Sequence, residues 1–148
     1  MANETDYAYA AGIIDGDGCI GIYKNKAKSC ISGYRYCLSI RVGMSDQLVP
    51  LWLKLTFGGS LSSGCNLGWG NLTMHKWALG SNQALDFLKQ VLPYLKTKAK
   101  HAELAVQFQE KKRANRWSRR KPIPTAVLEA EAILASNIHS LNRRCPIG

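Results

Sequence analysis

A stripe of small residues near the N-terminus constrains this chain more than any other feature of its sequence. The run from Tyr7 to Asp15 has helical composition, and Thr5 or Asp6 is available as its N-cap. Gly16 is placed to end this helix. Small residues recur within it at the spacing of one helix face: Ala8, Ala11, Gly12 and Asp15. Because no large side chain holds the backbones apart, a second helix can pack closely here, and we expect a helix–helix interface.

The charge balance predicts a polyanionic partner. The chain has 148 residues, 46% of them hydrophobic, so we expect a single folded domain over residues 1–148. Twenty Lys and Arg against ten Asp and Glu give a formal charge of +10, which favours nucleic acid first and an acidic membrane surface second. No apolar run approaches the roughly 20 residues that span a bilayer. Residues 1–6 lack the layout of a secretion signal, so we expect an intracellular protein without a membrane partner.

The cysteines and histidines predict neither a zinc site nor a disulfide framework. The five cysteines are odd in number and form no C-x-x-C pair: Cys19, Cys30, Cys37, Cys65 and Cys145. The three histidines, His75, His101 and His139, are far apart in the sequence. We therefore expect reduced, mostly structural thiols.

Hydrophobic periodicity predicts an α+β domain. The elements expected after the first helix are strands at Cys19–Lys26 and Tyr34–Val42, a helix at Gln47–Thr56, a hairpin in the Gly-rich stretch from Gly58 to Thr73, and helices from Ser81, from Thr97 and over Thr125–Asn142. The order α-β-β-α-β-β-α-α-α predicts a four-stranded antiparallel sheet backed by helices on one face, with a basic helical extension over about 111–148.

Alternation along the first two strands predicts which side chains face away from the core. On the first strand the apolar positions Ile20 and Ile22 leave three residues outward: Gly21, Tyr23 and Asn25. On the second strand the outward residues are Arg35, Cys37, Ser39 and Arg41. This face is polar and basic, and we expect Arg35 and Arg41 to be its main base-reading residues.

The third and fourth strands give two conflicting patterns. Leu72 and Met74 indicate one alternation, whereas Trp77 and Leu79 indicate the other. A β-bulge between the two pairs would reconcile them. The outward candidates on this basis are Asn71, Thr73 and Lys76.

The segment Asp15–Gly18, DGDG, places the carboxylate of Asp17 just past the predicted helix end. Unpaired carbonyls and the negative end of the helix dipole gather oxygen and negative charge there. If two copies pack by the small-residue stripe, two Asp17 carboxylates meet, which favours a hard divalent cation such as Mg²⁺. A calcium loop is excluded because Lys26 stands where that loop needs a Glu. A Gly-Asp turn without a catalytic role is the open alternative.

A dense basic run near the C-terminus predicts contacts with phosphates. Residues 111–121 hold seven positive charges in eleven residues. Such contacts add affinity rather than sequence specificity. The candidate residues are Lys111, Arg116, Arg119 and Arg120. Trp117 within the run is expected to be a packing anchor rather than a base-stacking residue.

Three segments, spread over nearly the whole chain, resemble those of the LAGLIDADG homing endonuclease family in the same order. Ala10–Gly18, AAGIIDGDG, is similar to the family motif, Leu92–Lys98, LPYLKTK, to a second landmark at the same distance downstream, and Leu141–Arg144, LNRR, to a common family ending. With one motif copy, the chain resembles the single-motif type. The resemblance implies an αββαββα fold in which the motif helices form a homodimer interface and the sheets form a saddle on double-stranded DNA. It also implies an intron-encoded enzyme that hydrolyses a long, roughly palindromic target to leave 3′ overhangs.

Carried over position by position, the resemblance makes Asp17 the metal-binding carboxylate and Gly16 the donor of a backbone carbonyl to the metal. Lys98 becomes the basic residue near the scissile phosphate, and Asp15 a helix-end and interface residue. The implied cofactor is Mg²⁺, with Mn²⁺ able to substitute and Ca²⁺ binding without supporting cleavage.

One departure from the family pattern concerns the positions just after the second strand. Related enzymes often carry polar or basic residues there, whereas the matched positions here are Met44 and Leu48. Gln47 can fill this catalytic role after a local shift.

The main alternative is a non-catalytic nucleic-acid-binding protein on the same scaffold, such as an intron RNA maturase or a DNA-binding regulator. Retention of Asp17 and Lys98 argues against the loss of cutting, and an intron RNA partner is expected only if the protein also acts as a maturase. A self-splicing intein is disfavoured because residues 145–148 lack the His-Asn pair that splicing uses.

Overall fold

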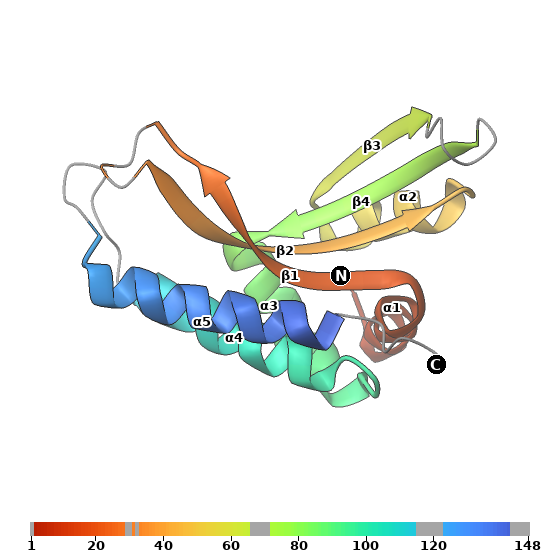
Figure 1. The fold of residues 1–148 in the computed structure, drawn as a ribbon. Helices are drawn as coiled ribbons and strands as arrows, with labels where there is room; N and C mark the ends of the chain where they lie inside the picture. Colours follow the sequence, from red (N-terminus) through yellow and green to blue (C-terminus); the bar gives the residue numbers. More distant parts are fainter. Residues whose placement is uncertain (1, 29–30, 32, 66–71, 115–122, 143–148) are drawn as a thin grey trace, which may run out of the picture.

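Helices pack against one face of an antiparallel sheet in this α+β protein (Figure 1). The structure is a computed structural model that describes residues 2–28, 31, 33–65, 72–114 and 123–142. Its elements are α1 (Glu4–Asp17), β1 (Gly18–Lys26), β2 (Tyr34–Met44), α2 (Leu48–Phe57), β3 (Ser60–Cys65), β4 (Thr73–Gly80), α3 (Ser81–Val91), the 3₁₀ turn η1 (Leu92–Tyr94), α4 (Ala99–Ala114) and α5 (Thr125–Asn142). The predicted fold class and element order are confirmed.

The sheet has four strands in the order β1-β2-β4-β3, and every neighbouring pair is antiparallel. The register between β3 and β4 runs without interruption from Ser60 opposite Ala78 to Cys65 opposite Thr73. The predicted bulge in this region is therefore wrong. Met74 lies on the outward face with Lys76 because the unbroken alternation that buries Trp77 and Leu79 continues along β4. Its methyl group lies beside Gly43, 4.0 Å from where an added Cβ would stand.

Helix α1 begins earlier than its sequence suggested. Asn3 is the N-cap: its side chain accepts from the Asp6 backbone N–H at 2.9 Å, and the Asp6 carboxylate accepts from the Asn3 N–H at 3.1 Å. This reciprocal capping box satisfies two exposed donors, so the start predicted at Tyr7 with a cap at Thr5 or Asp6 is wrong. The helix also continues past Asp15 to Asp17.

The core lies between the sheet and the helices, and it confirms the predicted alternation of β1 and β2. The buried inward residues of the sheet are Ile20, Ile22, Leu38, Ile40, Val42, Trp77 and Leu79. Figure 1 shows α3, α4 and α5 beneath the sheet, with α1 at the end where β1 begins. The opposite face of the sheet carries no helix in the described part of the chain.

Helix α5 is tied to the edge of the sheet at its C-terminal end. The Asn142 side chain donates to the Ile20 carbonyl on β1 at 3.0 Å. In the ranges described, no helix is long and apolar enough to cross a bilayer.

Candidate active site and nucleic-acid interface

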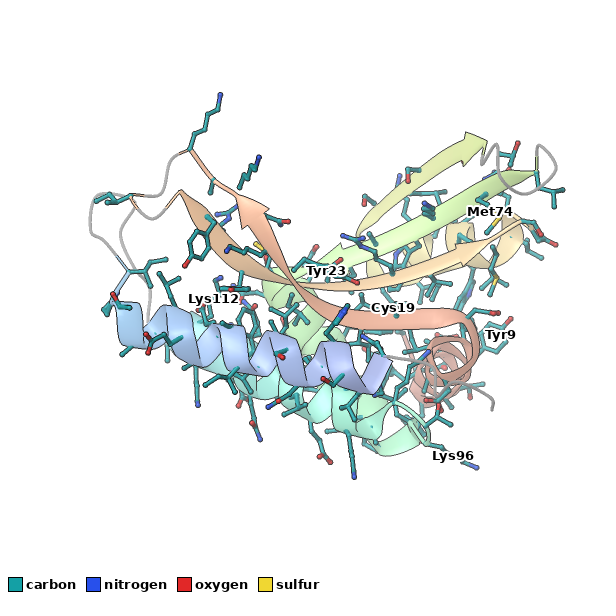
Figure 2. All side chains as sticks on the ribbon, viewed as in Figure 1. Tyr9, Cys19, Tyr23, Met74, Lys96 and Lys112 are labelled. Atoms are coloured by element: carbon teal, nitrogen blue, oxygen red, sulfur yellow. The ribbon has the colours of Figure 1, made fainter. Side chains whose placement is uncertain are left out.

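Asp17 stands at the end of α1 and lines a hollow of about 560 Å³ at the margin of the outward sheet face. The other lining residues come from the end of β2, the turn after it and the start of β4: Gly43, Met44, Ser45, Asp46, Leu72 and Met74. Figure 2 shows Met74 at this end of the sheet. Asp17 is exposed, so its carboxylate is open to a cation from solution.

A second carboxylate, Asp46, lines the same hollow and was missed by sequence reasoning. One of its oxygens accepts from the Leu48 backbone N–H at 2.8 Å, at the start of α2. Gln47 occupies the N-cap position of α2 without a side-chain capping bond and is not among the residues that line the hollow. The signal available in the sequence was an acidic residue in the turn directly after the second strand.

Lys98 is held against the C-terminal end of α1. Its ammonium donates to the Ile14 carbonyl at 2.8 Å and also to the carbonyl of Gly18, the residue that follows Asp17. A cation that binds the last carbonyls of a helix complements the negative end of its dipole. Lys98 is therefore an anchor of the segment that carries Asp17, as well as the candidate for a catalytic role.

Asp15 binds the segment that leads into α4. Its carboxylate accepts from the backbone N–H groups of Lys96 at 2.9 Å and Lys98 at 3.1 Å, and from the Thr97 hydroxyl at 3.0 Å. Partial burial raises the pKa of Asp15, but these hydrogen bonds and the Lys98 charge outweigh it and hold the pKa below its ordinary value. The carboxylate thus joins the end of α1 to the start of α4.

Replacing Asp15 by Asn is expected to lower the free energy of unfolding by about 1–3 kcal/mol at pH 7, because charge-assisted bonds to backbone donors are lost. Because the pKa of Asp15 is lower in the folded protein than in the unfolded chain, its carboxylate stabilises the fold at pH values above the unfolded-state pKa of about 3.9. This stabilisation is lost as the pH falls through the folded-state pKa. The difference between wild type and variant should therefore shrink below about pH 4. Urea unfolding at pH 7 and below pH 4 measures it.

The matched control for this measurement is Glu4→Gln, which neutralises an exposed acid on the same helix. It should change stability by less than about 0.5 kcal/mol. An Asp15→Asn protein as stable as this control at pH 7 would show that the contacts to residues 96–98 contribute little.

The small-residue stripe of α1 divides between the core and the surface. Ala8 and Gly12 are exposed, whereas Ala11 is fully buried in the core of its own chain and Asp15 faces residues 96–98. The exposed small residues are thus Ala8, Gly12 and Gly16, and a Cβ added to either glycine would meet nothing within 4 Å. This surface is shaped for the close approach of another helix.

Large apolar side chains continue this surface onto α2. Tyr9 is 53% exposed and packs edge-on against Trp52, with ring centres 5.1 Å apart. On the same face of α2, one turn to either side of Trp52, Leu48 and Leu55 are 72% and 77% exposed. Exposed leucines flanking a small-residue stripe are typical of a protein–protein contact surface.

The outward face of the sheet carries most of the residues predicted to bind nucleic acid. Tyr23 and Asn25 on β1 alternate with the buried Ile20 and Ile22, as expected. On β2 the outward residues are Arg35, Cys37, Ser39 and Arg41, with both arginines exposed. Lys76 lies on the same face of β4, opposite Gly43 of β2.

The basic run is described only at its beginning. Lys111 is exposed on the last turns of α4, beside the hollow between α4 and α5. Lys112 donates to the Tyr36 carbonyl and so joins α4 to β2. Three further candidates lie outside the described residues: Arg116, Arg119 and Arg120.

Comparisons with known proteins identify the fold. No protein-family model and no curated protein matches the chain. Among solved structures, the homing endonuclease I-CvuI in complex with the I-CreI target has a TM-score of 0.77 and 23% sequence identity, over 98% of this chain and 87% of that chain. The archaeal intron-encoded homing endonuclease I-Vdi141I complexed with DNA has a TM-score of 0.75 and 12% identity, over 96% and 87%. The LAGLIDADG meganuclease I-AabMI bound to uncleaved DNA has a TM-score of 0.65 and 17% identity, over 94% of this chain and 47% of that chain. The chain therefore has the fold of LAGLIDADG homing endonucleases.

Proposed function

We propose that two copies of this chain, which has the homing endonuclease fold, form a metal-dependent endonuclease that cuts both strands of a long, roughly palindromic DNA site and leaves 3′ overhangs. The observation that carries the proposal is the place of Asp17. Its exposed carboxylate lies where the small-residue face of α1 meets the hollow at the margin of the outward sheet face. Contact through α1 would bring two such carboxylates together at the midpoint of one continuous surface, formed by the outward sheet faces of both copies.

The homodimer has two sources of support. The exposed Ala8, Gly12 and Gly16 allow close helix contact, and the apolar side chains beside them gain from burial. The meganuclease I-AabMI matches this chain over 47% of its own length, so two copies of this chain correspond in size to one copy of that protein. A two-fold dimer matches a roughly palindromic site because each half presents the same reading face.

The donors around the hollow suit a hard divalent cation. Asp17, Asp46 and Ser45 supply oxygen atoms, which are the ligands that Mg²⁺ prefers. When bound, such a cation lowers the pKa of water and stabilises charge on phosphate oxygens. Asp17 holds it, with the Gly16 carbonyl as a further donor at the helix end.

Lys98 has two roles in this proposal. It holds the last turn of α1 through the Ile14 and Gly18 carbonyls, and its charge stabilises the phosphate oxygens as they become more negative. Lys98→Met is expected to slow single-turnover cleavage by roughly a hundredfold while lowering stability by only about 1 kcal/mol. Rates measured on folded protein, beside a thermal melt, separate the two effects. An unchanged rate would leave Lys98 with the structural role alone.

The outward faces of β1 and β2 are proposed to read bases in the major groove, where every base pair has a distinct donor and acceptor pattern. Arg35 and Arg41 are the residues suited to bidentate contact with guanine. Lys76, Lys111 and the basic residues beyond position 114 are proposed to bind phosphates, which adds affinity on any sequence.

Incubation of the protein with a pool of randomised DNA duplexes tests this function. With Mg²⁺ or Mn²⁺, sequenced products should share one roughly palindromic site with 3′ overhangs, whereas Ca²⁺ should support binding to the same site without cleavage. A chelator should abolish cutting. Binding without cleavage in Mg²⁺ would instead favour the non-catalytic nucleic-acid-binding alternative, and preferential binding of intron RNA would favour a maturase.

A further inference from the structure

Tyr23 does not point straight out from the sheet. Its side chain folds back along β1 over Gly21, so that its hydroxyl lies 3.6 Å from the Cys19 sulfur (Figure 2). A Cβ at Gly21 would lie 2.8 Å from the tip of the ring, which is closer than real side chains approach. The missing side chain of Gly21 therefore makes room for this ring conformation.

The guanidinium of Arg41 lies on this ring. Arg41 is the cross-strand neighbour of Cys19, and its central guanidinium carbon is 4.3 Å from the centre of the Tyr23 ring. Its Nε donates to the Ser39 hydroxyl at 3.4 Å. The ion pairs of the described ranges join Lys89 to Glu110 and Arg113 to Asp86, and neither involves Arg41. The Tyr23 ring holds the guanidinium from one side, and its terminal N–H groups remain available for a bidentate acceptor.

Two features indicate that Tyr23 holds Arg41 in place rather than contacting a base itself. Its hydroxyl is turned along the strand toward Cys19, and its ring face is covered by Arg41. Burial raises the pKa of Tyr23 and the contact with Cys19 raises it further, while the Arg41 charge lowers it, so the phenol is neutral at physiological pH. The ring is thus an uncharged platform under a cation.

We propose that Tyr23 is a specificity-determining positioning residue: stacked on Gly21, it presents the Arg41 guanidinium to a guanine at one base-pair position in each half-site. This inference rests on the proposed function. Because Arg41 pairs in register with Cys19, two residues after Asp17, that guanine lies in the inner part of the half-site, close to the cut. A guanidinium held in one orientation discriminates between bases, because its two hydrogen bonds to guanine form only when the N–H groups face the base edge.

Selection of bound duplexes from a randomised pool in Ca²⁺ tests the proposal with the full-length protein. Arg41→Met should erase a guanine preference at one symmetric pair of positions. Tyr23→Leu should weaken the same preference about three- to thirtyfold, as expected from the loss of a cation–π contact. Tyr23→Phe should retain it within about twofold, because the ring face remains. In the Arg41→Met background, Tyr23→Leu should have no further effect, because the two residues act through one contact.

A matched control comes from the same two strands. Lys24 lies over the Tyr34 ring at 4.1 Å, so Tyr34→Leu also removes an aromatic partner of a cation, away from the proposed reading position. It should leave the guanine preference unchanged. If Tyr23→Leu does not fold, Gly21→Ala displaces the ring tip and should give the same loss.

Three results would overturn the proposal: Tyr23→Leu with wild-type preference, a change at a different base pair, or effects of Tyr23→Leu and Arg41→Met that add. A wild-type protein that enriches no sequence overturns the proposed function itself, and this inference with it.

Discussion

Replacing Asp17 by Asn is expected to reduce cleavage by more than about a hundredfold, because losing the proposed metal ligand should cost more than losing groups that only orient such a ligand. Binding of the target should change little, since the outward sheet face is untouched and asparagine keeps the shape of the side chain. Asp17 is exposed and ends α1 in its own chain, so the fold does not depend on its charge. Single-turnover cleavage in Mg²⁺ and equilibrium binding in Ca²⁺ measure the two quantities separately.

Asp86→Asn makes the same chemical change at an exposed site on α3, where the carboxylate is 3.5 Å from Arg113. An exposed ion pair of this kind contributes at most about 1 kcal/mol, so this variant should cut and bind as wild type does. Near wild-type cleavage by Asp17→Asn in Mg²⁺ would place the active site elsewhere.

Gly12→Leu should separate the two subunits of the proposed dimer without unfolding either. A Cβ at Gly12 meets nothing within 4 Å, so a leucine fits the isolated chain, whereas a facing helix would be pushed outward. Overpacking at a close contact costs about 1–3 kcal/mol or more. Sedimentation should show a dimeric wild type and a monomeric variant with an unchanged circular dichroism spectrum, and cleavage of both strands should be lost together.

Gly64→Leu provides the control, because it adds the same side chain in open space on β3. It should remain dimeric. A wild-type protein that sediments as a monomer without DNA, or a Gly12→Leu protein that still dimerises and cuts, would contradict assembly through α1.

The parts of the fold that followed from the sequence are those in which polar and apolar residues alternate cleanly. On β1 and β2 the buried Ile20, Leu38 and Ile40 alternate with polar residues, so the outward face was identified correctly. Helix α1 gives no such contrast, because alanine and glycine fit both core and surface. The burial of Ala11 and the exposure of Gly12 therefore became visible only once the helix was packed on its own chain.

Other features depend on contacts between distant residues. Met74 faces outward because β4 pairs without interruption with β2 and β3, so the alternation set by the buried Trp77 continues to it, and those partner strands are distant in the sequence. The carboxylate of Asp15 binds residues 96–98, more than eighty positions away in the sequence, and nothing in the local sequence around Asp15 indicates these contacts. The choice between Asp46 and Gln47 at the hollow depends on where the turn after β2 places each side chain.

The two margins of the sheet have a consequence for solubility. An unpaired strand edge invites another chain to add a strand, which leads to aggregation. At the β1 margin the Asn142 side chain binds the Ile20 carbonyl, and at the other margin β3 is only six residues long and holds three serines. Short, polar or covered edges discourage such growth. Such edges favour assembly through the helices over growth at the sheet margins, which leaves the outward sheet face for the proposed duplex.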